Sequence, residues 1–308
     1  MRLLVVGAGS IGGYFGGRLV QAGRDVTFLV RPARAAKLQE SGLRIVSPFG
    51  DAKLQPKVVT TETLAGTYDA VLLTVKAYQL DAAMEDLAPA VGPETMILPA
   101  LNGMGHMELL ARRFGPHNVV GCALKASTTL DDDGRVVQLS ILMDVAYGEL
   151  SGERTPRIAA LHEFMRSAKI NARLSPAIRR EMWEKWIFIA SLGAITCLTR
   201  ATVGEVEACS GGAAFALRLL DEVVAIVAAG DVPPSDGFLA GVRATLTQKG
   251  SPLAASMCRD LQAGKPTEAE AIVGDLIRRG AKTGIAAPLL SAAYVCLAVH
   301  QNKIGMVR

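Results

Sequence analysis

Lys185 is the side chain of this sequence with the clearest capacity for proton transfer. It lies near the start of a predicted helix, 181–196, between two tryptophans. The residues one and two helical turns further on are Ile189 and Gly193, so the lysine does not belong to a solvated stripe. Two interpretations are open. The lysine either extends from the start of the helix to water or is a partly desolvated group that protonates a reacting oxygen.

The first dozen residues predict a binding site for a dinucleotide. A short apolar run, 2–6, leads directly into a glycine motif and then into a predicted helix, 13–21. In this setting the first glycine permits a tight turn, the second lets the backbone approach a pyrophosphate, and the third lets helix and strand pack closely. The motif consists of Gly7, Ala8, Gly9, Ser10, Ile11 and Gly12. A structural glycine turn without a ligand is the alternative.

The end of the next predicted strand, 25–30, bears on which dinucleotide binds. An acidic residue there would accept hydrogen bonds from the ribose of NAD. This chain has Arg31 instead, followed by Arg34, and its next acid is Glu40. A guanidinium can hold a 2′-phosphate with two hydrogen bonds, whereas a carboxylate would repel it. The sequence therefore favours NADP over NAD, with a solvated surface arginine as the alternative.

A third polar group lies near the end of the chain. Thr267 could cap a helix with Glu270 at its third position, which would place Glu268 in the first turn. That cap is a sufficient structural explanation of these residues. Glu268 gains a catalytic interpretation only from the resemblance given below.

The composition of the chain excludes several other classes of protein. The 308 residues are 50% hydrophobic and 20% charged, with a net charge of +4, and no apolar run approaches the length of a membrane span. There is no basic block of the kind that binds nucleic acid. The five cysteines and four histidines form no ligand cluster. We expect reduced thiols, a cytoplasmic location and no metal site.

Two different patterns divide the chain. Up to about residue 173 short strands alternate with helices, which predicts an α/β, doubly wound Rossmann-type domain over 1–173. Its expected strands after the first two are 43–46, 54–59, 69–75, 96–98, 119–123 and 136–139. The Asp-Asp-Asp-Gly turn at 131–134 indicates a hairpin, with antiparallel strands added at one edge of the sheet. From 174 to 308 we expect an all-helical domain, with helices over 177–196, 211–229, 238–247, 256–263, 267–283 and 288–301.

Taken together, five stretches resemble the ketopantoate reductases, also called 2-dehydropantoate 2-reductases. They are GAGSIGGYFGGRL at 7–19, TVKAYQ at 74–79, LNGMGH at 101–106, WEKW at 183–186 followed by LTRATVGE at 198–205, and SMCRDLQAGKPTEAEAIVG at 256–274. Each is weak evidence, but their order and spacing span essentially the whole chain. The resemblance implies NADPH-dependent reduction of a small 2-oxo acid, nominally ketopantoate to pantoate. It leaves the oligomeric state open, a homodimer included.

The resemblance also implies roles for individual residues. Lys185 matches the family's proton donor, and Glu268 its active-site glutamate. Asn102 matches the asparagine at the nicotinamide and substrate, and Ser256 the serine that contacts the substrate. On the adenosine side, the matching residues are Arg31, Lys76 and Gln79.

The sequence departs from the family at three positions of the expected substrate pocket. Ile189, Gly193 and Val203 stand where the family has asparagines. Apolar residues there remove donors that would hold a polar substrate. The alternatives are therefore a reductase of a more apolar 2-oxo acid and a non-catalytic protein that senses NADP(H).

Overall fold

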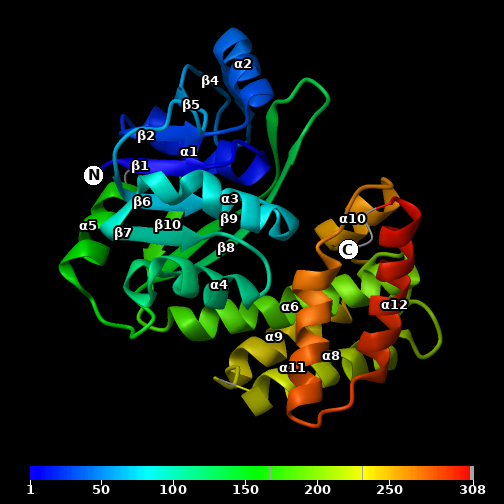
Figure 1. Cartoon of the computed structure of the whole chain (residues 1–308). Coiled ribbons are helices and arrows are strands. Elements are labelled where there is room, and N and C mark those ends of the chain that lie inside the picture. Colours follow the sequence, from blue (N-terminus) through cyan, green and yellow to red (C-terminus); the bar gives the residue numbers. More distant parts are fainter. Residues whose placement is uncertain (167, 169, 231, 306–308) are drawn as a thin grey trace. The chain divides into compact units, whose positions relative to one another are not determined.

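The chain forms two compact units, which are drawn in the computed structural model of Figure 1. The structure describes residues 1–166, 168, 170–230 and 232–305. One unit comprises Met1–Leu101 and His106–Arg179, and the other comprises 102–105 together with the chain from Arg180 onward. The short segment 102–105 thus groups with the C-terminal half. The predicted domain boundary after residue 173 stays a prediction.

A five-stranded parallel sheet forms the centre of the first unit and confirms the Rossmann-type fold. Its strand order is β5-β2-β1-β6-β7. Along β1, Leu3 and Val5 enter one hydrophobic cluster and Leu4 and Val6 another, so both faces of the sheet are buried. The strands are β1 Leu3–Val6, β2 Val26–Leu29, β5 Lys57–Val59, β6 Tyr68–Leu73 and β7 Val91–Pro99.

The expectation that the late hairpin extends one edge of this sheet is wrong. Val119 makes a single parallel bridge with Ile97 of β7, and the chain then enters a second sheet of order β10-β9-β3-β4, with β8 paired to β9. The two hairpin strands, β8 and β9, pair with each other, and the start of β9 also pairs in parallel with β3. The strands are β3 Leu43–Val46, β4 Ala52–Leu54, β8 Gly121–Leu130, β9 Val136–Gly148 and β10 Asn171–Leu174.

Helix α1 (Ser10–Gln21) packs between the two sheets. This close packing explains why the helix contains glycines that do not belong to the nucleotide-binding motif. A Cβ at Gly16 would lie 2.6 Å from the Phe28 ring, and one at Gly17 would lie 2.7 Å from Ile45 of the second sheet. The apolar side chains of α3 and α4 line the opposite face of the parallel sheet. The other helices of this unit are α2 Pro32–Ser41, α3 Leu80–Leu87, α4 Gly105–Phe114 and α5 Pro156–Met165, with short 3₁₀ turns η1 Ala77–Gln79, η2 Ala88–Ala90 and η3 Pro116–Asn118.

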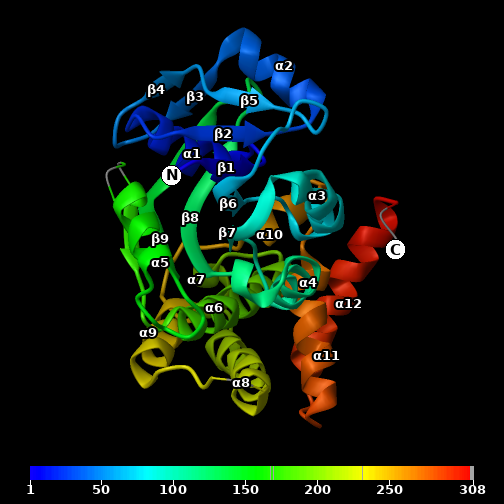
Figure 2. The same ribbon diagram turned by 60° about the vertical axis from the view of Figure 1, so that its left-hand side comes forward.

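Among its described residues, the C-terminal unit contains helices and no strand, as predicted (Figure 2). Its elements are α6 Ile178–Thr199, α7 Val203–Glu207, α8 Gly212–Gly230, α9 Asp236–Leu246, α10 Ser256–Gln262, the π-helical turn η4 Glu270–Gly274, α11 Asp275–Lys282 and α12 Pro288–Lys303. The prediction missed α7, although Thr202 and Glu205 form a capping box at its start. Within the described part of the chain, no helix is long and apolar enough to cross a membrane.

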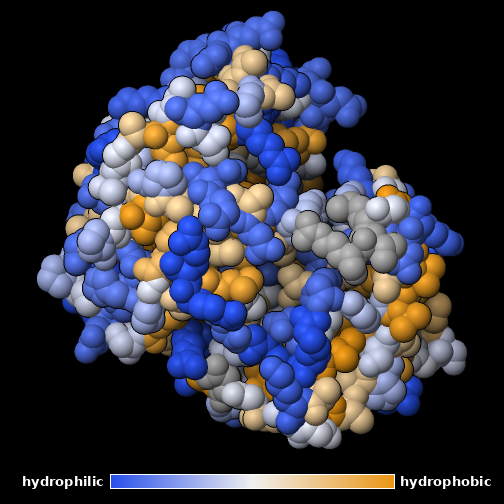
Figure 3. All heavy atoms as spheres, in the orientation of Figure 1, coloured by the Kyte–Doolittle hydropathy of each residue, from blue (hydrophilic) through white to orange (hydrophobic). Residues whose placement is uncertain are grey.

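The surface of the C-terminal unit is mixed in character. In Figure 3, apolar atoms gather over the region where Figure 1 shows α12. On this helix Val295 is 60% exposed and Val299 is 47% exposed, one helical turn apart. Large apolar side chains on a surface are ordinary when they are few, so we assign no role to this pair.

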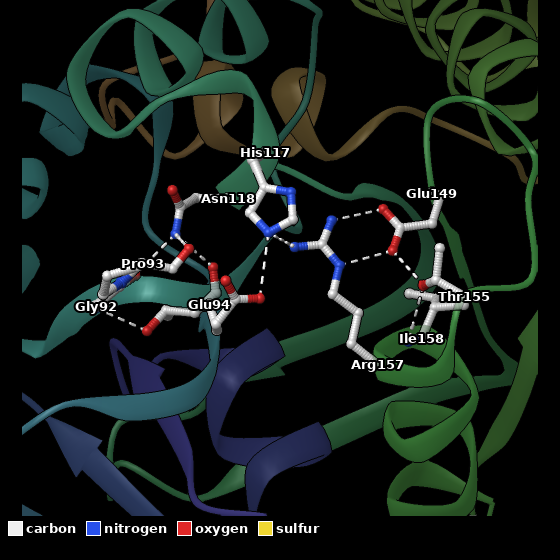
Figure 4. Close-up of polar contacts among 10 residues, drawn as sticks. Gly92, Pro93, Glu94, His117, Asn118, Glu149, Thr155, Arg157 and Ile158 are labelled. Atoms are coloured by element: carbon white, nitrogen blue, oxygen red, sulfur yellow. Dashed lines mark hydrogen bonds and ion pairs between the residues drawn. The ribbon is translucent and has the colours of Figure 1, made fainter.

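A polar network in the first unit ties β7, η3 and α5 together (Figure 4). Arg157 donates from Nε and Nη2 to the two oxygens of Glu149, at 2.8 and 2.7 Å, and Thr155 Oγ1 donates to Glu149 Oε1 at 2.6 Å. The hydrogen bond from Arg157 holds the pKa of Glu149 below its usual range. Asn118 Nδ2 donates to the carbonyls of Gly92 and Thr95, at 2.9 Å each. Because these side chains bind one another and backbone carbonyls, we assign the network a structural role.

Candidate functional site

A pocket of about 470 Å³ in the first unit collects half of the residues predicted to bind a dinucleotide. Its lining includes the glycine turn at the end of β1, the end of β2, and a residue from η1. The carboxyl ends of parallel strands are where this class of sheet binds ligands. From the predicted set, the described residues of the lining include Gly7, Ala8, Gly9, Arg31 and Gln79, but not Lys76.

The glycine turn is held in a form that few other residues could adopt. Gly7 has a φ of +95°, which strongly favours glycine. A Cβ at Gly12 would lie 2.1 Å from the Gly7 carbonyl oxygen, so the third glycine is required for close packing. Thr74, from the stretch TVKAYQ, donates its hydroxyl to the carbonyls of Val6 and Gly7, at 2.9 and 3.1 Å. That hydroxyl braces the turn from the neighbouring strand.

The second glycine and the start of α1 fit a pyrophosphate. At Gly9 a Cβ would have nothing within 4 Å, so the backbone there is open to a ligand. Gly9 is also the N-cap of α1, and no side chain caps this end of the helix. Ser10, Ile11 and Gly12 form the first turn of the helix. Uncapped N–H groups and the positive end of the helix dipole are suited to an anion.

A second arginine, not assigned to the site from the sequence, lies in the same pocket beside Arg31. Arg34 Nε donates to the carbonyl of Ala8 at 3.2 Å. Its Nη2 is buried and has no hydrogen-bond partner among the described residues, and burial lowers the pKa of this guanidinium. A buried donor without a partner is costly, and an anionic group in the pocket would satisfy it. The signal was available, because Arg31 and Arg34 are three residues apart at the start of α2.

In the C-terminal unit, the structure brings together two of the predicted active-site residues that are far apart in sequence. Asn102 Nδ2 donates to Glu268 Oε2 at 3.2 Å. The Asn-Gly turn fits closely against the turn that follows Glu268, since a Cβ at Gly103 would lie 2.3 Å from the Ala271 carbonyl oxygen. Gly103 also has a φ of +84°. The close packing thus requires a glycine at position 103, and the hydrogen bond to Glu268 uses the side-chain amide of Asn102.

Lys185 lies in α6 and is 8% exposed, so its face of the helix is not solvated. The next residue, Trp186, donates its indole N–H to the carbonyl of Ile272 at 2.9 Å. Ile272 belongs to the π-helical turn that follows Glu268, and π turns are frequent at functional sites. This hydrogen bond ties the helix that carries Lys185 to the segment that carries Glu268.

The remaining predicted residues occupy different environments. Ser256 is exposed at the start of α10. Gly193 is buried, and a Cβ there would lie 2.7 Å from the terminal methyl of Met257, the neighbour of Ser256. Ile189 is partly exposed, whereas Val203 is fully buried. An amide at position 193 would therefore displace a methionine side chain.

Family models cover nearly the whole chain. The model described as "Ketopantoate reductase PanE/ApbA" matches residues 3–152, and the one described as "Ketopantoate reductase PanE/ApbA C terminal" matches residues 177–301. The chain is 36% identical to "Uncharacterized oxidoreductase YkpB" of Bacillus subtilis, over 98% of this chain and 100% of that protein. It is 28% identical to the 2-dehydropantoate 2-reductase of Mesorhizobium japonicum, over 95% of each chain.

Solved structures agree with this relationship. The 2-dehydropantoate 2-reductase of Geobacter metallireducens superposes with a TM-score of 0.86 at 28% identity, covering 96% of this chain and 99% of that one. A D-mandelate dehydrogenase with NADH and anilino(oxo)acetate has a TM-score of 0.87, covering 100% of both chains, but its 20% identity shows only a shared fold. The chain therefore belongs to the ketopantoate reductase family of oxidoreductases.

Proposed function

We propose that this protein uses NADPH to reduce ketopantoate to pantoate at C2. The observation that carries the proposal is the hydrogen bond between Asn102 and Glu268, a pairing that a cofactor sensor has no need to keep. The pocket with Arg31 and Arg34 supports NADPH. We further propose a cytoplasmic location and a homodimer; the homodimer is supported by the Staphylococcus aureus structure described as a dimeric ketopantoate reductase.

The proposed mechanism assigns one task to each residue. When bound, the nicotinamide supplies the hydride to C2 of the oxo acid. Lys185 donates a proton to the ketone oxygen, which gains negative charge in the transition state. Glu268 and Asn102 orient the substrate and the lysine, and Ser256 holds the carboxylate. A 2-oxo acid, NADPH and one proton thus give a 2-hydroxy acid and NADP⁺.

The direct test is NADPH oxidation by the purified protein, followed by absorbance, with a panel of 2-oxo acids that includes ketopantoate. We expect turnover and the appearance of pantoate. If the protein binds NADPH tightly but turns over no 2-oxo acid, it is a cofactor sensor and the proposal is wrong.

We expect Arg31→Asp to weaken NADPH binding by about 10-fold or more, because a charge-assisted hydrogen bond to the 2′-phosphate is worth roughly 1.5–3 kcal/mol. NADH lacks that phosphate, so its affinity should change little. Calorimetric titration with both cofactors measures the difference. Lys53→Asp is the matched control, because it makes the same change in net charge at an exposed residue outside the pocket. Equal affinity of the unaltered protein for NADPH and NADH would contradict the assignment.

The second candidate substrate is a more apolar 2-oxo acid, and the packing of Gly193 against Met257 is the observation behind it. The room for a side chain at position 193 is filled by the methionine methyl, so no amide can extend from there without displacing it. A substrate hydroxyl left unpaired in an apolar pocket costs about 1–3 kcal/mol. On this alternative, 2-oxoisovalerate should exceed ketopantoate in kcat/KM, by up to roughly 100-fold.

The comparison of these two substrates decides between the candidates, and a double variant tests the positions. Ile189→Asn with Gly193→Asn should shift the ratio of the two kcat/KM values toward ketopantoate. Val203→Asn is not a suitable companion, because Val203 is fully buried. An unchanged ratio in the double variant would show that these two positions do not influence the substrate.

A further inference from the structure

The last turn of α12 holds the backbone that precedes Glu268. Thr267 N–H donates to Gln301 Oε1 at 3.0 Å, and Gln301 Nε2 donates to the Thr267 carbonyl at 3.4 Å. The adjacent His300 Nε2 lies 2.8 Å from the carbonyl oxygen of Lys265. One side-chain amide thus pairs with both backbone groups of the residue before Glu268. These contacts join positions 34 or 35 residues apart.

Gln301 makes the hydrogen bond that the sequence assigned to a local cap. In a capping box Glu270 would accept from the Thr267 N–H. The predicted box is wrong, because Glu270 is bound by Arg278 and by the Tyr294 hydroxyl instead. The Thr267 hydroxyl is buried and has no hydrogen-bond partner among the described residues, so it caps nothing. The segment therefore depends on a distant side chain.

The segment that Gln301 holds connects α10 to the π-helical turn η4. Residues 265–268 have no regular secondary structure, and they follow Gly264, whose φ is +65°. At the other end, the Glu268 carbonyl accepts the first helical hydrogen bond, from Ile272 N–H at 3.0 Å. Glu268 itself is 6% exposed, and its carboxylate accepts from Asn102. A shift of the Thr267 backbone would move this carboxylate directly.

We propose that Gln301 is a positioning residue, which fixes the backbone at Thr267 so that the Glu268 carboxylate is held against Asn102. The inference rests on the function proposed for Glu268. A primary amide, which is uncharged at neutral pH, supplies a donor and an acceptor in one plane and can therefore pair with both groups of a peptide residue. Displacement of a catalytic group by about 1 Å can lower a rate by up to roughly 10²-fold.

The test compares three variants of the full chain. Gln301→Met keeps the length of the side chain and removes both hydrogen bonds. Asn302→Ala is the matched control, since it removes an exposed amide from the same helical turn. We expect Gln301→Met to lower kcat about 10-fold, with the affinity for NADPH unchanged, while Asn302→Ala behaves as the unaltered protein.

Gln301→Glu provides a readout that a general loss of stability would not move. A protonated carboxyl has one donor and one acceptor, as the amide has, whereas a carboxylate has no donor and faces the Thr267 carbonyl. The kcat of this variant relative to the unaltered protein should therefore rise as the pH falls from about 8 to about 5, toward the ordinary glutamate pKa of roughly 4.3. The Gln301→Met variant should show no such recovery. A flat ratio for Gln301→Glu would overturn the proposal.

Two further measurements identify the route of the effect. Because Gln301 acts through Glu268, the effects of Gln301→Met and Glu268→Gln on kcat should be strongly non-additive; additive effects would overturn the proposal. Amide hydrogen exchange over 264–270 does not depend on turnover, and it should accelerate in Gln301→Met. If the unaltered protein reduces no 2-oxo acid, the proposed function fails, and the exchange result still decides whether Gln301 holds the segment. Unchanged exchange would show that it does not.

Discussion

Replacing Lys185 by alanine should lower kcat by about 10²- to 10⁴-fold, the range for loss of a positioned proton donor. The variant should bind NADPH nearly as well as the unaltered protein, because Lys185 does not line the pocket proposed for the dinucleotide. A group that acts in the transition state affects kcat more than ground-state binding. Single-turnover kinetics of NADPH oxidation, together with a cofactor titration, measure the two effects separately.

The control for Lys185→Ala is Arg180→Ala, which removes an exposed cation from the same helix, α6. This variant should keep its activity. Because Lys185 is 8% exposed, its removal also leaves a small cavity, so Lys185→Met serves as a variant of similar length and volume. Near-normal turnover of the methionine variant would show that Lys185 is a buried structural lysine and not the proton donor.

The second large effect is expected at the glycine turn, where two alanine substitutions should fail in different ways. Gly12→Ala puts a methyl group 2.1 Å from the Gly7 carbonyl oxygen and 2.3 Å from the Thr74 hydroxyl. Backbone must move to relieve this overlap, so we expect a loss of about 1–3 kcal/mol or more in the free energy of unfolding. Cofactor binding should be lost with the shape of the turn. Thermal denaturation and cofactor titration measure both.

Gly9→Ala is the informative partner of that variant. Its methyl group would meet nothing within 4 Å in the protein, so its stability should stay within about 0.5 kcal/mol of the unaltered protein. NADPH binding should still fall by about 10-fold or more, because the methyl group occupies the approach of the pyrophosphate to the backbone. Unimpaired binding by Gly9→Ala would place the dinucleotide elsewhere.

Features that depend on neighbouring residues were predictable from the sequence. The apolar run of β1, the glycine turn and the start of α1 form a continuous local signal, and the structure confirms each of them. The six helices predicted after residue 174 are confirmed too, although the fifth begins with a π-helical turn. Their apolar content indicates burial, and tertiary packing supplies most of the stability of helices in proteins.

Predictions from neighbouring residues were wrong where a residue or strand that is distant in the sequence formed the interaction instead. The capping box at Thr267 is absent because Arg278 and Tyr294 bind Glu270. The hairpin strands do not extend the parallel sheet, because β9 pairs with β3 in the second sheet. Strand β3 precedes the hairpin by about 75 residues. Such choices depend on which groups the fold brings within reach, and no short window of sequence contains both partners.

The dinucleotide-binding motif, the basic residue after β2 and the helical character of the C-terminal half could be predicted from the sequence by itself. Each of these features depends on the backbone conformation, charge or hydrophobic pattern of a few neighbouring residues. Only the tertiary structure decided which side chains meet. Asn102 and Glu268, which are 166 positions apart, form a hydrogen bond. Arg34 lies in the pocket with a buried Nη2 that has no hydrogen-bond partner among the described residues. Gln301 accepts a hydrogen bond from the Thr267 N–H. A hydrogen bond between distant positions requires the packing of every element between them, and that packing is a property of the whole chain.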